Sequence, residues 1–183
     1  MRRRPLTSRV TPEAEIMALE VSPEDMRAYR RALGAFATGV ALIATRAEIG
    51  TGRAVSGLIV NSFTSVSLKP RLVLWCLGND SDRFPLFSGA ERWSVNVLRS
   101  HHRALSDRIA RPGASDVAEV DFADLDGAPV LPDAAASLAC MTHERIPMGD
   151  HLIIVGEVTA FQTSETGDAL TYHRGAYGRT GEG

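Results

Sequence analysis

Short apolar runs separated by turn-forming residues make up most of the chain. Five runs are rich in β-branched and aromatic residues and are bounded by Gly, Pro, Asn or Asp: VALIAT from Val40, AVSGLIV from Ala54, RLVLWCL from Arg71, WSVNVL from Trp93 and LIIVGEVTAF from Leu152. Runs of this length and composition predict strands. They outnumber the helical segments and do not alternate with them. The pattern therefore predicts a mainly β fold with flanking helices, an antiparallel barrel rather than a doubly wound parallel sheet.

A helix is predicted from Ser22, where the residues SPED supply an N-cap, a proline at the first helical position and acids in the first turn. Gly39 is expected to end it. The apolar face of this helix is formed by Met26, Tyr29, Leu33 and Phe36. Residues 1–21 precede the folded domain, which is expected to span 22–183. Four arginines and no acid among the first ten residues predict a flexible arm, or an arm that docks on a partner subunit.

Two further helices are expected within the strand-rich part. RSHHRALSDRIARP after Leu98 predicts one that is capped by Ser100 and buries Leu105 and Ile109. Residues 83–88 predict a short one. Residues 115–133 hold six acids and no base, which predicts a solvated loop that Pro129 and Pro132 keep irregular.

Composition narrows the class of protein. The chain has 183 residues, of which 44% are hydrophobic and 23% charged, as expected for one domain with a single core. Its 20 basic and 22 acidic residues argue against a nucleic-acid binder. Cys76 and Cys140 are the two cysteines, and neither a zinc site nor a disulfide framework is indicated. Apolar runs are too short for a membrane helix, and the basic start lacks the apolar segment of a secretory signal. A cytoplasmic protein is expected.

Candidate chemistry lies where polar residues follow apolar strands, because the P-loop, zincin and α/β-hydrolase signatures are absent. VNSFTSVSL from Val60 crowds one amide and four hydroxyls around Phe63. These neutral donors and acceptors suit a planar heterocycle with C=O and N–H edges, such as a flavin. A Ser/Thr-rich edge strand is the alternative, and the residues alone do not separate the two.

Three other polar segments are weaker signals. In LGNDSDRFPL, Ser81 and Arg83 flank a predicted helix start, where a hydroxyl, a guanidinium and backbone N–H groups can meet a phosphate; a capped surface turn would look the same. His151 in MGDH stands before a strand, where a structural role is the common one. LTYHRGAYG from Leu170 either closes a pocket or forms a terminal loop.

Taken in order, these segments resemble the flavin reductase-like family. RRALGAFATGVALIAT, SGLIVNSFTSVSL, LVLWCL, SVNVL, GAPVLPDAAASLAC, GDHLIIVGEV and YHRGAYG carry the resemblance, which covers residues 30–178. The chain is most similar to the small NAD(P)H:flavin oxidoreductase components that serve two-component flavin monooxygenases. The resemblance implies an FMN-binding split β-barrel, usually a homodimer with the flavin near the subunit interface.

Site residues are implied residue by residue. His151 matches the histidine near the nicotinamide and is the implied catalytic residue. The implied flavin-binding residues are Asn61, Ser62, Phe63, Ser65, Val66 and Ser67 along the ring, Ser81, Arg83 and Phe84 at the phosphate, Arg108 at the tail, and Tyr177 near the ring. Arg174 is expected to join them by helping to stabilise the anionic reduced flavin. This chain departs from the family pattern in LKPRLV, where LDPPLV is common, and at Ile109, where an aromatic residue is common.

The implied activity is hydride transfer from NADH or NADPH to FMN or FAD. Reduced flavin would then diffuse to a monooxygenase component in a transient partnership. Two alternatives share the barrel or the pattern: a flavin-binding protein or pyridoxamine-phosphate-oxidase-like oxidase, and a purely structural or interaction barrel without flavin. No metal site, nucleic acid or membrane is expected.

Overall fold

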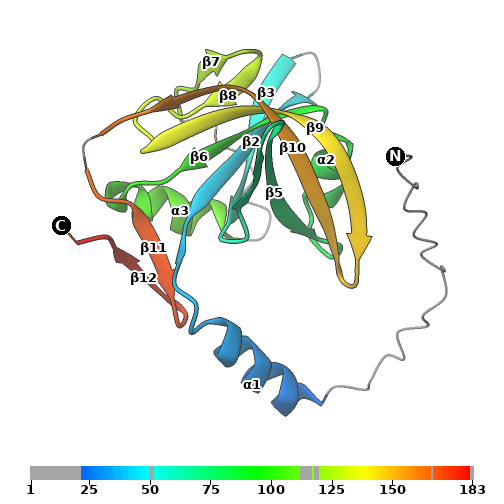
Figure 1. Ribbon diagram of the computed structural model, residues 1–183, viewed down its shortest axis with the longest axis vertical. Helices are drawn as coiled ribbons and strands as arrows, with labels where there is room; N and C mark the ends of the chain where they lie inside the picture. The colour runs from blue at the N-terminus through cyan, green and yellow to red at the C-terminus, as the bar shows by residue number, and fades with distance from the viewer. Residues whose placement is uncertain (1–21, 50–51, 112–116, 118–119, 166, 182–183) are drawn as a thin grey trace, which may run out of the picture. The chain divides into compact units, whose positions relative to one another are not determined.

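The computed structural model describes residues 22–49, 52–111, 117, 120–165 and 167–181 (Figure 1). The chain divides into two compact units, residues 1–33 and 34–183. The predicted arm, residues 1–21, lies outside the described residues. The elements are α1 (Pro23–Leu33), β1 (Thr38–Gly39), β2 (Ala41–Ile49), β3 (Gly52–Val60), β4 (Thr64–Leu68), β5 (Arg71–Gly78), α2 (Phe84–Gly89), β6 (Arg92–Val97), η1 (Ser100–His102), α3 (Arg103–Ile109), β7 (Ala123–Leu125), β8 (Ala128–Val130), β9 (Ala136–Met148), β10 (His151–Thr163), β11 (Leu170–His173) and β12 (Ala176–Arg179).

The first helix begins as predicted and ends early. The Ser22 hydroxyl accepts the backbone N–H three residues later at 3.1 Å, which is the N-cap hydrogen bond. The helix stops at Leu33, six residues before Gly39, and Gly34, a residue that disfavours the helical conformation, follows directly. The predicted continuation to Gly39 is therefore wrong. No residue of α1 is buried.

All five predicted strands are present, and antiparallel pairing joins them into a sheet ordered β3-β2-β6-β9-β10-β5-β4. The sheet is not closed, because its edge strands β3 and β4 do not pair. A three-stranded sheet, β1-β11-β12, stands beside it. The predicted mainly β fold with flanking helices is confirmed, and the open sheet is typical of a split barrel.

Strand β2 separates two apolar clusters. Successive side chains of a strand point to opposite faces, so Ala41 and Ile43 enter one cluster while Leu42 and Ala44 enter the other. The first cluster centres on three aromatic rings, in which Trp75 packs edge-on against Phe87 and Trp93. Each of the three side chains is at most 1% exposed. The second cluster lies under α3 and β11 and includes Ile109, Val117 and Leu170.

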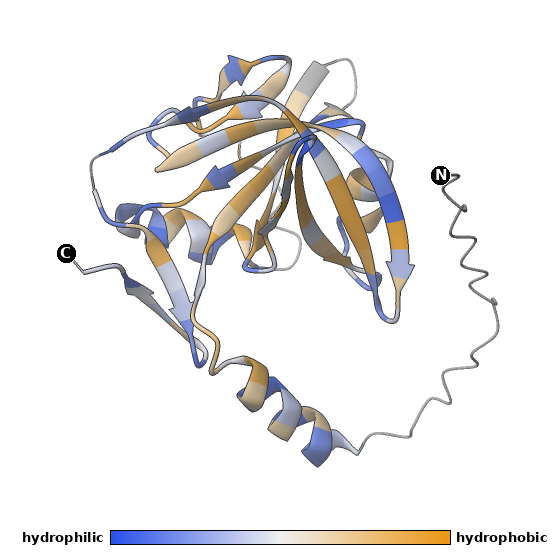
Figure 2. Cartoon of the chain, viewed as in Figure 1, coloured by the Kyte–Doolittle hydropathy of each residue, from blue (hydrophilic) through white to orange (hydrophobic). Residues whose placement is uncertain are grey.

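The long β9–β10 hairpin passes over the first cluster, beside the ring of Trp93, at Gly156. A Cβ atom on Gly156 would lie 2.4 Å from the Trp93 ring, so only glycine lets the strand pass this closely. In Figure 2 the apolar first part of β9 gives way to a polar stretch, residues 142–145. Polar residues of this kind hide a strand from a search for apolar runs, which explains why β9 had no run of its own in the prediction.

The predicted helix after Leu98 is divided into η1 and α3, and Ser100 does not cap it. The Ser100 hydroxyl donates instead to Asp168 Oδ1 at 2.7 Å. The cap comes from His102, whose Nδ1 accepts the backbone N–H of Arg99 at 3.1 Å. Ile109 is fully buried as predicted.

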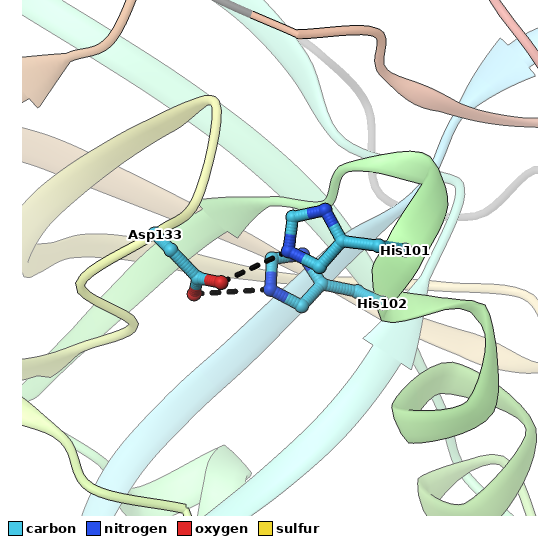
Figure 3. Close-up of side chains that lie close together, drawn as sticks. All are labelled: His101, His102 and Asp133. Atoms are coloured by element: carbon cyan, nitrogen blue, oxygen red, sulfur yellow. Dashed lines mark hydrogen bonds and ion pairs between the residues drawn. The ribbon is translucent and has the colours of Figure 1, made fainter.

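Asp133 holds His101 and His102 in place (Figure 3). Its carboxylate oxygens lie 2.9 Å from Nε2 of His101 and 3.0 Å from Nε2 of His102. Because Nδ1 of His102 accepts a hydrogen bond, its proton sits on Nε2, where a metal ligand would need a lone pair. Burial, together with the neighbouring His101 and Arg99, lowers the pKa of His102 against the opposing effect of Asp133, so the ring stays neutral near pH 7. The trio therefore acts as a hydrogen-bonded clamp on η1.

The expected acidic loop contains regular structure, so that prediction is wrong in part. Strands β7 and β8 form a hairpin there, and Pro129 lies inside β8. Asp126 and Gly127 make its turn with positive φ, which these residue types tolerate.

Among the helices that the structure describes, none is long and apolar enough to cross a membrane.

Candidate functional site

A pocket of about 660 Å³ lies between α3, the end of β3 and the β11–β12 hairpin, and we call it the α3 pocket. Its volume is in the range of pockets that hold small molecules and cofactors. The lining residues are Val40, Ile59, Val60, Asn61, Arg103, Asp107, Ala110, Tyr172, Gly175, Ala176 and Tyr177.

Two of the predicted flavin-binding residues line this pocket. Asn61 follows β3 directly, and its exposed side chain can offer both a donor and an acceptor. Tyr177 comes from β12, far along the chain, and faces the same space. The terminal segment LTYHRGAYG therefore forms a hairpin that contributes to a pocket wall, which was one of its two possible roles.

The wall around Tyr177 contains residues that the sequence analysis did not identify. Tyr177 Oη is 2.8 Å from the buried Ser106 hydroxyl, and its ring packs against Tyr172 with centroids 5.2 Å apart. The guanidinium of Arg103 lies 4.5 Å from the centre of the Tyr177 ring and donates through Nε to Asp107 Oδ2 at 2.9 Å. The i,i+4 spacing of Arg103 and Asp107 predicts their ion pair, but only the fold places it on Tyr177.

The first residues of the hydroxyl-rich segment contact the interior of the fold, and the later ones are exposed on the surface. Ser62 Oγ accepts the backbone N–H of Cys76 at 3.0 Å, which ties this segment to β5. Phe63 packs against the first apolar cluster. Beyond it, Ser65 and Val66 are exposed on the edge strand β4, where a bulge falls between Ser65 and Ser67.

The predicted phosphate loop is present between β5 and α2, but its arginine points elsewhere. Arg83 is 7% exposed, and its Nη2 donates to the backbone carbonyls of Ile109 at 2.9 Å and Arg111 at 3.1 Å. Ser81 Oγ accepts the backbone N–H of Arg83 at 3.2 Å, and Phe84 packs against the first cluster. The guanidinium thus bridges this loop to the end of α3.

His151 lies at the mouth of the same loop. It is the first residue of β10 and pairs with Gly78 at the end of β5. Its Nδ1 is 2.7 Å from Asp150 Oδ1, and because a carboxylate only accepts, Nδ1 carries the proton. When the ring is neutral, its lone pair is then on Nε2. This nitrogen lies close to Gly78, since a Cβ atom added to Gly78 would be 3.8 Å from it.

The last two predicted residues flank the α3 pocket without lining it. Arg108 lies on α3, next to Asp107. Arg174 occupies the β11–β12 turn with φ of 50°, and its backbone N–H donates to the carbonyl of Gly34 at 2.8 Å.

The thiol of Cys76 offers no nucleophile. Burial raises its pKa, against a smaller opposing effect of the hydrogen bond from Ser62, so the thiol is protonated at neutral pH.

Four of the predicted residues define two groups. Asn61 and Tyr177 belong to the α3 pocket, whereas Ser81 and His151 belong to the loop after β5. Arg83 connects the groups, because it extends from the loop to the end of the helix that walls the pocket. A separate cavity of about 370 Å³, lined in part by Arg46 and Arg92, contains none of the predicted residues.

Comparison with known proteins adds a family to this geometry. A family model described as "Flavin reductase like domain" matches residues 33–181. A "Probable flavin reductase" of Rhizobium meliloti is 42% identical over 84% of this chain, which spans about half of that relative (48%). "FMN reductase (NADH) SmoA" of Agrobacterium fabrum is 41% identical over 85% of this chain and 87% of its own length.

Two solved structures share the fold. The Streptomyces globisporus NADH:FAD oxidoreductase SgcE6, in complex with NAD and FAD fragments, superposes with a TM-score of 0.77 at 31% identity, covering 88% of this chain and 96% of its own. The styrene monooxygenase flavin reductase of Pseudomonas putida S12 superposes with a TM-score of 0.75 at 28% identity, covering 85% of this chain and 98% of its own.

The Arg83 bridge predicts a stability loss on substitution. Arg83→Gln should lower the free energy of unfolding by about 2–4 kcal/mol, because buried carbonyls at the end of α3 lose a charged donor. Urea unfolding measures this. Arg46→Gln, which breaks a half-exposed ion pair with Asp124, is the matched control and should cost about 1 kcal/mol or less. Equal, small losses in both variants would contradict a structural role for Arg83.

Proposed function

The chain belongs to the flavin reductase-like domain family, and from this premise we propose that it is an NAD(P)H-dependent flavin reductase. It transfers hydride from reduced nicotinamide to FMN or FAD and supplies the reduced flavin to a partner monooxygenase. The observation that carries this proposal is the α3 pocket, which Asn61 and Tyr177 both line although they lie 116 positions apart in the sequence.

The residues present fit a flavin. The pocket is large enough, at about 660 Å³, and combines aliphatic side chains with two tyrosines and an amide. Bound flavin and nicotinamide supply the redox chemistry, so the protein needs few acids or bases of its own. Asn61 offers hydrogen bonds to the heterocycle edge, Ser65 and Ser67 extend the polar surface along β4, and Arg174 offers positive charge beside the pocket.

His151 orients the hydride donor in this proposal. Asp150 fixes its tautomer, so Nε2 can accept an N–H from the nicotinamide carboxamide. Such a contact holds a donor at reacting distance and removes no proton from it. The role is therefore one of positioning, which agrees with an exposed histidine whose acidic partner, Asp150, is itself exposed.

We infer a homodimer from the edge of the sheet. Val66 is 50% exposed and Leu68 is 86% exposed on β4, the edge strand that follows the predicted flavin segment. An edge strand with exposed apolar side chains favours pairing with another chain, and a two-fold contact here would complete the flavin site.

Cys76 and Cys140 are unpaired thiols, which supports a cytoplasmic location.

Flavin binding at β4 is tested with Ser65→Trp. The exposed site tolerates the larger side chain in the fold, but the indole would block the ring-binding surface, so flavin affinity should fall at least tenfold. Flavin fluorescence titration measures the affinity, and circular dichroism checks the fold. Gln162→Trp, at an exposed position of β10, is the control and should bind normally. Equal affinity in Ser65→Trp would remove β4 from the site.

The positioning role of His151 is tested with His151→Ala. Wild-type protein should oxidise NADH only when flavin is present, and the variant should lose about 10–100-fold in kcat/KM, or about 1.4–2.7 kcal/mol, with flavin affinity unchanged. Stopped-flow flavin reduction separates the steps. His143→Ala on β9 is the control. An unchanged hydride-transfer rate at every NADH concentration would exclude His151 from the site.

The dimer is tested by sedimentation at micromolar protein concentration. Wild-type protein with flavin should sediment as a dimer, and Leu68→Asp should shift it to monomer, because a charge would replace an apolar contact. A flavin-bound monomer in the wild type would contradict the proposal.

A further inference from the structure

Arg103 stands out in the α3 pocket because its guanidinium is both fixed and accessible. It lines this pocket and also a smaller cavity of about 240 Å³ beside Ser100 and Arg179. Its side chain is 53% exposed. Long exposed arginines normally sample many conformations, and this one is confined by contacts on two sides.

The first contact is the Tyr177 ring, which lies 4.5 Å from the guanidinium carbon. That ring is itself immobile, because Ser106 is fully buried and bonds to its hydroxyl at 2.8 Å. The edge-on packing of Tyr172 adds a second support. The guanidinium therefore rests on a rigid aromatic surface.

The second contact is the Asp107 carboxylate, which takes the Nε proton at 2.9 Å. Within the described part of the chain, no acceptor is present for the two terminal nitrogens of Arg103. A planar guanidinium with four unused N–H groups in fixed orientation matches the oxygens of a phosphate group. Preorganisation by Asp107 and Tyr177 reduces the entropy lost when such a ligand binds.

The arginine of the expected phosphate loop is differently engaged. Nη2 of Arg83 serves two main-chain carbonyls, and its side chain is 7% exposed. A guanidinium buried in this way would have to give up those bonds to meet a ligand, leaving buried carbonyls without a donor. Arg103 has no such cost.

We propose that Arg103 binds a phosphate group of the nucleotide cofactor in the α3 pocket, an inference that rests on the proposed function. Phosphate reaches this pocket from one of two sources, the flavin nucleotide or the nicotinamide dinucleotide. Both present phosphate ester oxygens, and the experiment distinguishes them.

The test compares ligands with and without phosphate on Arg103→Gln, which keeps a polar side chain and removes the charge. If the flavin supplies the phosphate, Kd for FMN and FAD should rise about tenfold while Kd for riboflavin stays unchanged. If the dinucleotide supplies it, KM for NADH should rise about tenfold, while turnover with a phosphate-free N-alkyl dihydronicotinamide and all flavin affinities stay unchanged. Arg103→Lys, which retains the charge, should recover part of the loss.

Three controls make the outcome decisive. Arg46→Gln also breaks an arginine–aspartate pair, at 2.8 Å, but outside the pocket, and should bind every ligand normally. Thermal unfolding confirms that Arg103→Gln is folded. Wild-type protein that fails to bind flavin or oxidise NADH would refute the proposed function. With a functional wild type, the assignment of Arg103 is overturned if Arg103→Gln binds all ligands normally, or if riboflavin or the phosphate-free donor loses as much as its phosphorylated counterpart.

Discussion

The Arg83 guanidinium reaches from the loop after β5 to the last carbonyls of α3, and the candidate site depends on this bridge. The loop carries Ser81 and lies beside His151, while α3 contributes Arg103 and Asp107 to the pocket wall. A buried cation cannot be left without acceptors, so its hydrogen bonds fix the distance between the two regions. In the proposed function, this constraint relates a pocket built from β3, α3 and β12 to the histidine at the start of β10.

Burial separates the polar side chains of the site into those that hold the fold together and those that are accessible to ligands. Ser62 and Arg83 are bound to main-chain atoms and give the site its shape. Asn61, Arg103 and His151 are accessible and remain available to ligands. Because the redox chemistry belongs to flavin and nicotinamide, the protein's contribution is to hold two ligands in register. A rigid scaffold with a few accessible hydrogen-bonding groups is sufficient for that task.

The strands were predictable because their apolar runs reflect burial that any packing must satisfy, as Trp75 and Ile43 illustrate. The helix end at Leu33 and the hairpin β7–β8 were not. The hairpin depends on the local backbone geometry of Asp126 and Gly127, both of which have positive φ. Asn61 and Tyr177 lie in polar segments that the residues alone singled out, and the family pattern implied their roles. The engagement of Arg83 and the exposure of Arg103 depend on contacts between distant elements, which neither periodicity nor a motif encodes.

A structure of the protein with bound FMN would locate the flavin relative to both parts of the site, the α3 pocket and the loop beside His151. We expect the flavin in the α3 pocket, in contact with Asn61 and Tyr177, with one ring face open toward His151. Flavin bound instead in the cavity beside Arg46 and Arg92, or bound away from both tested residues, would contradict this expectation.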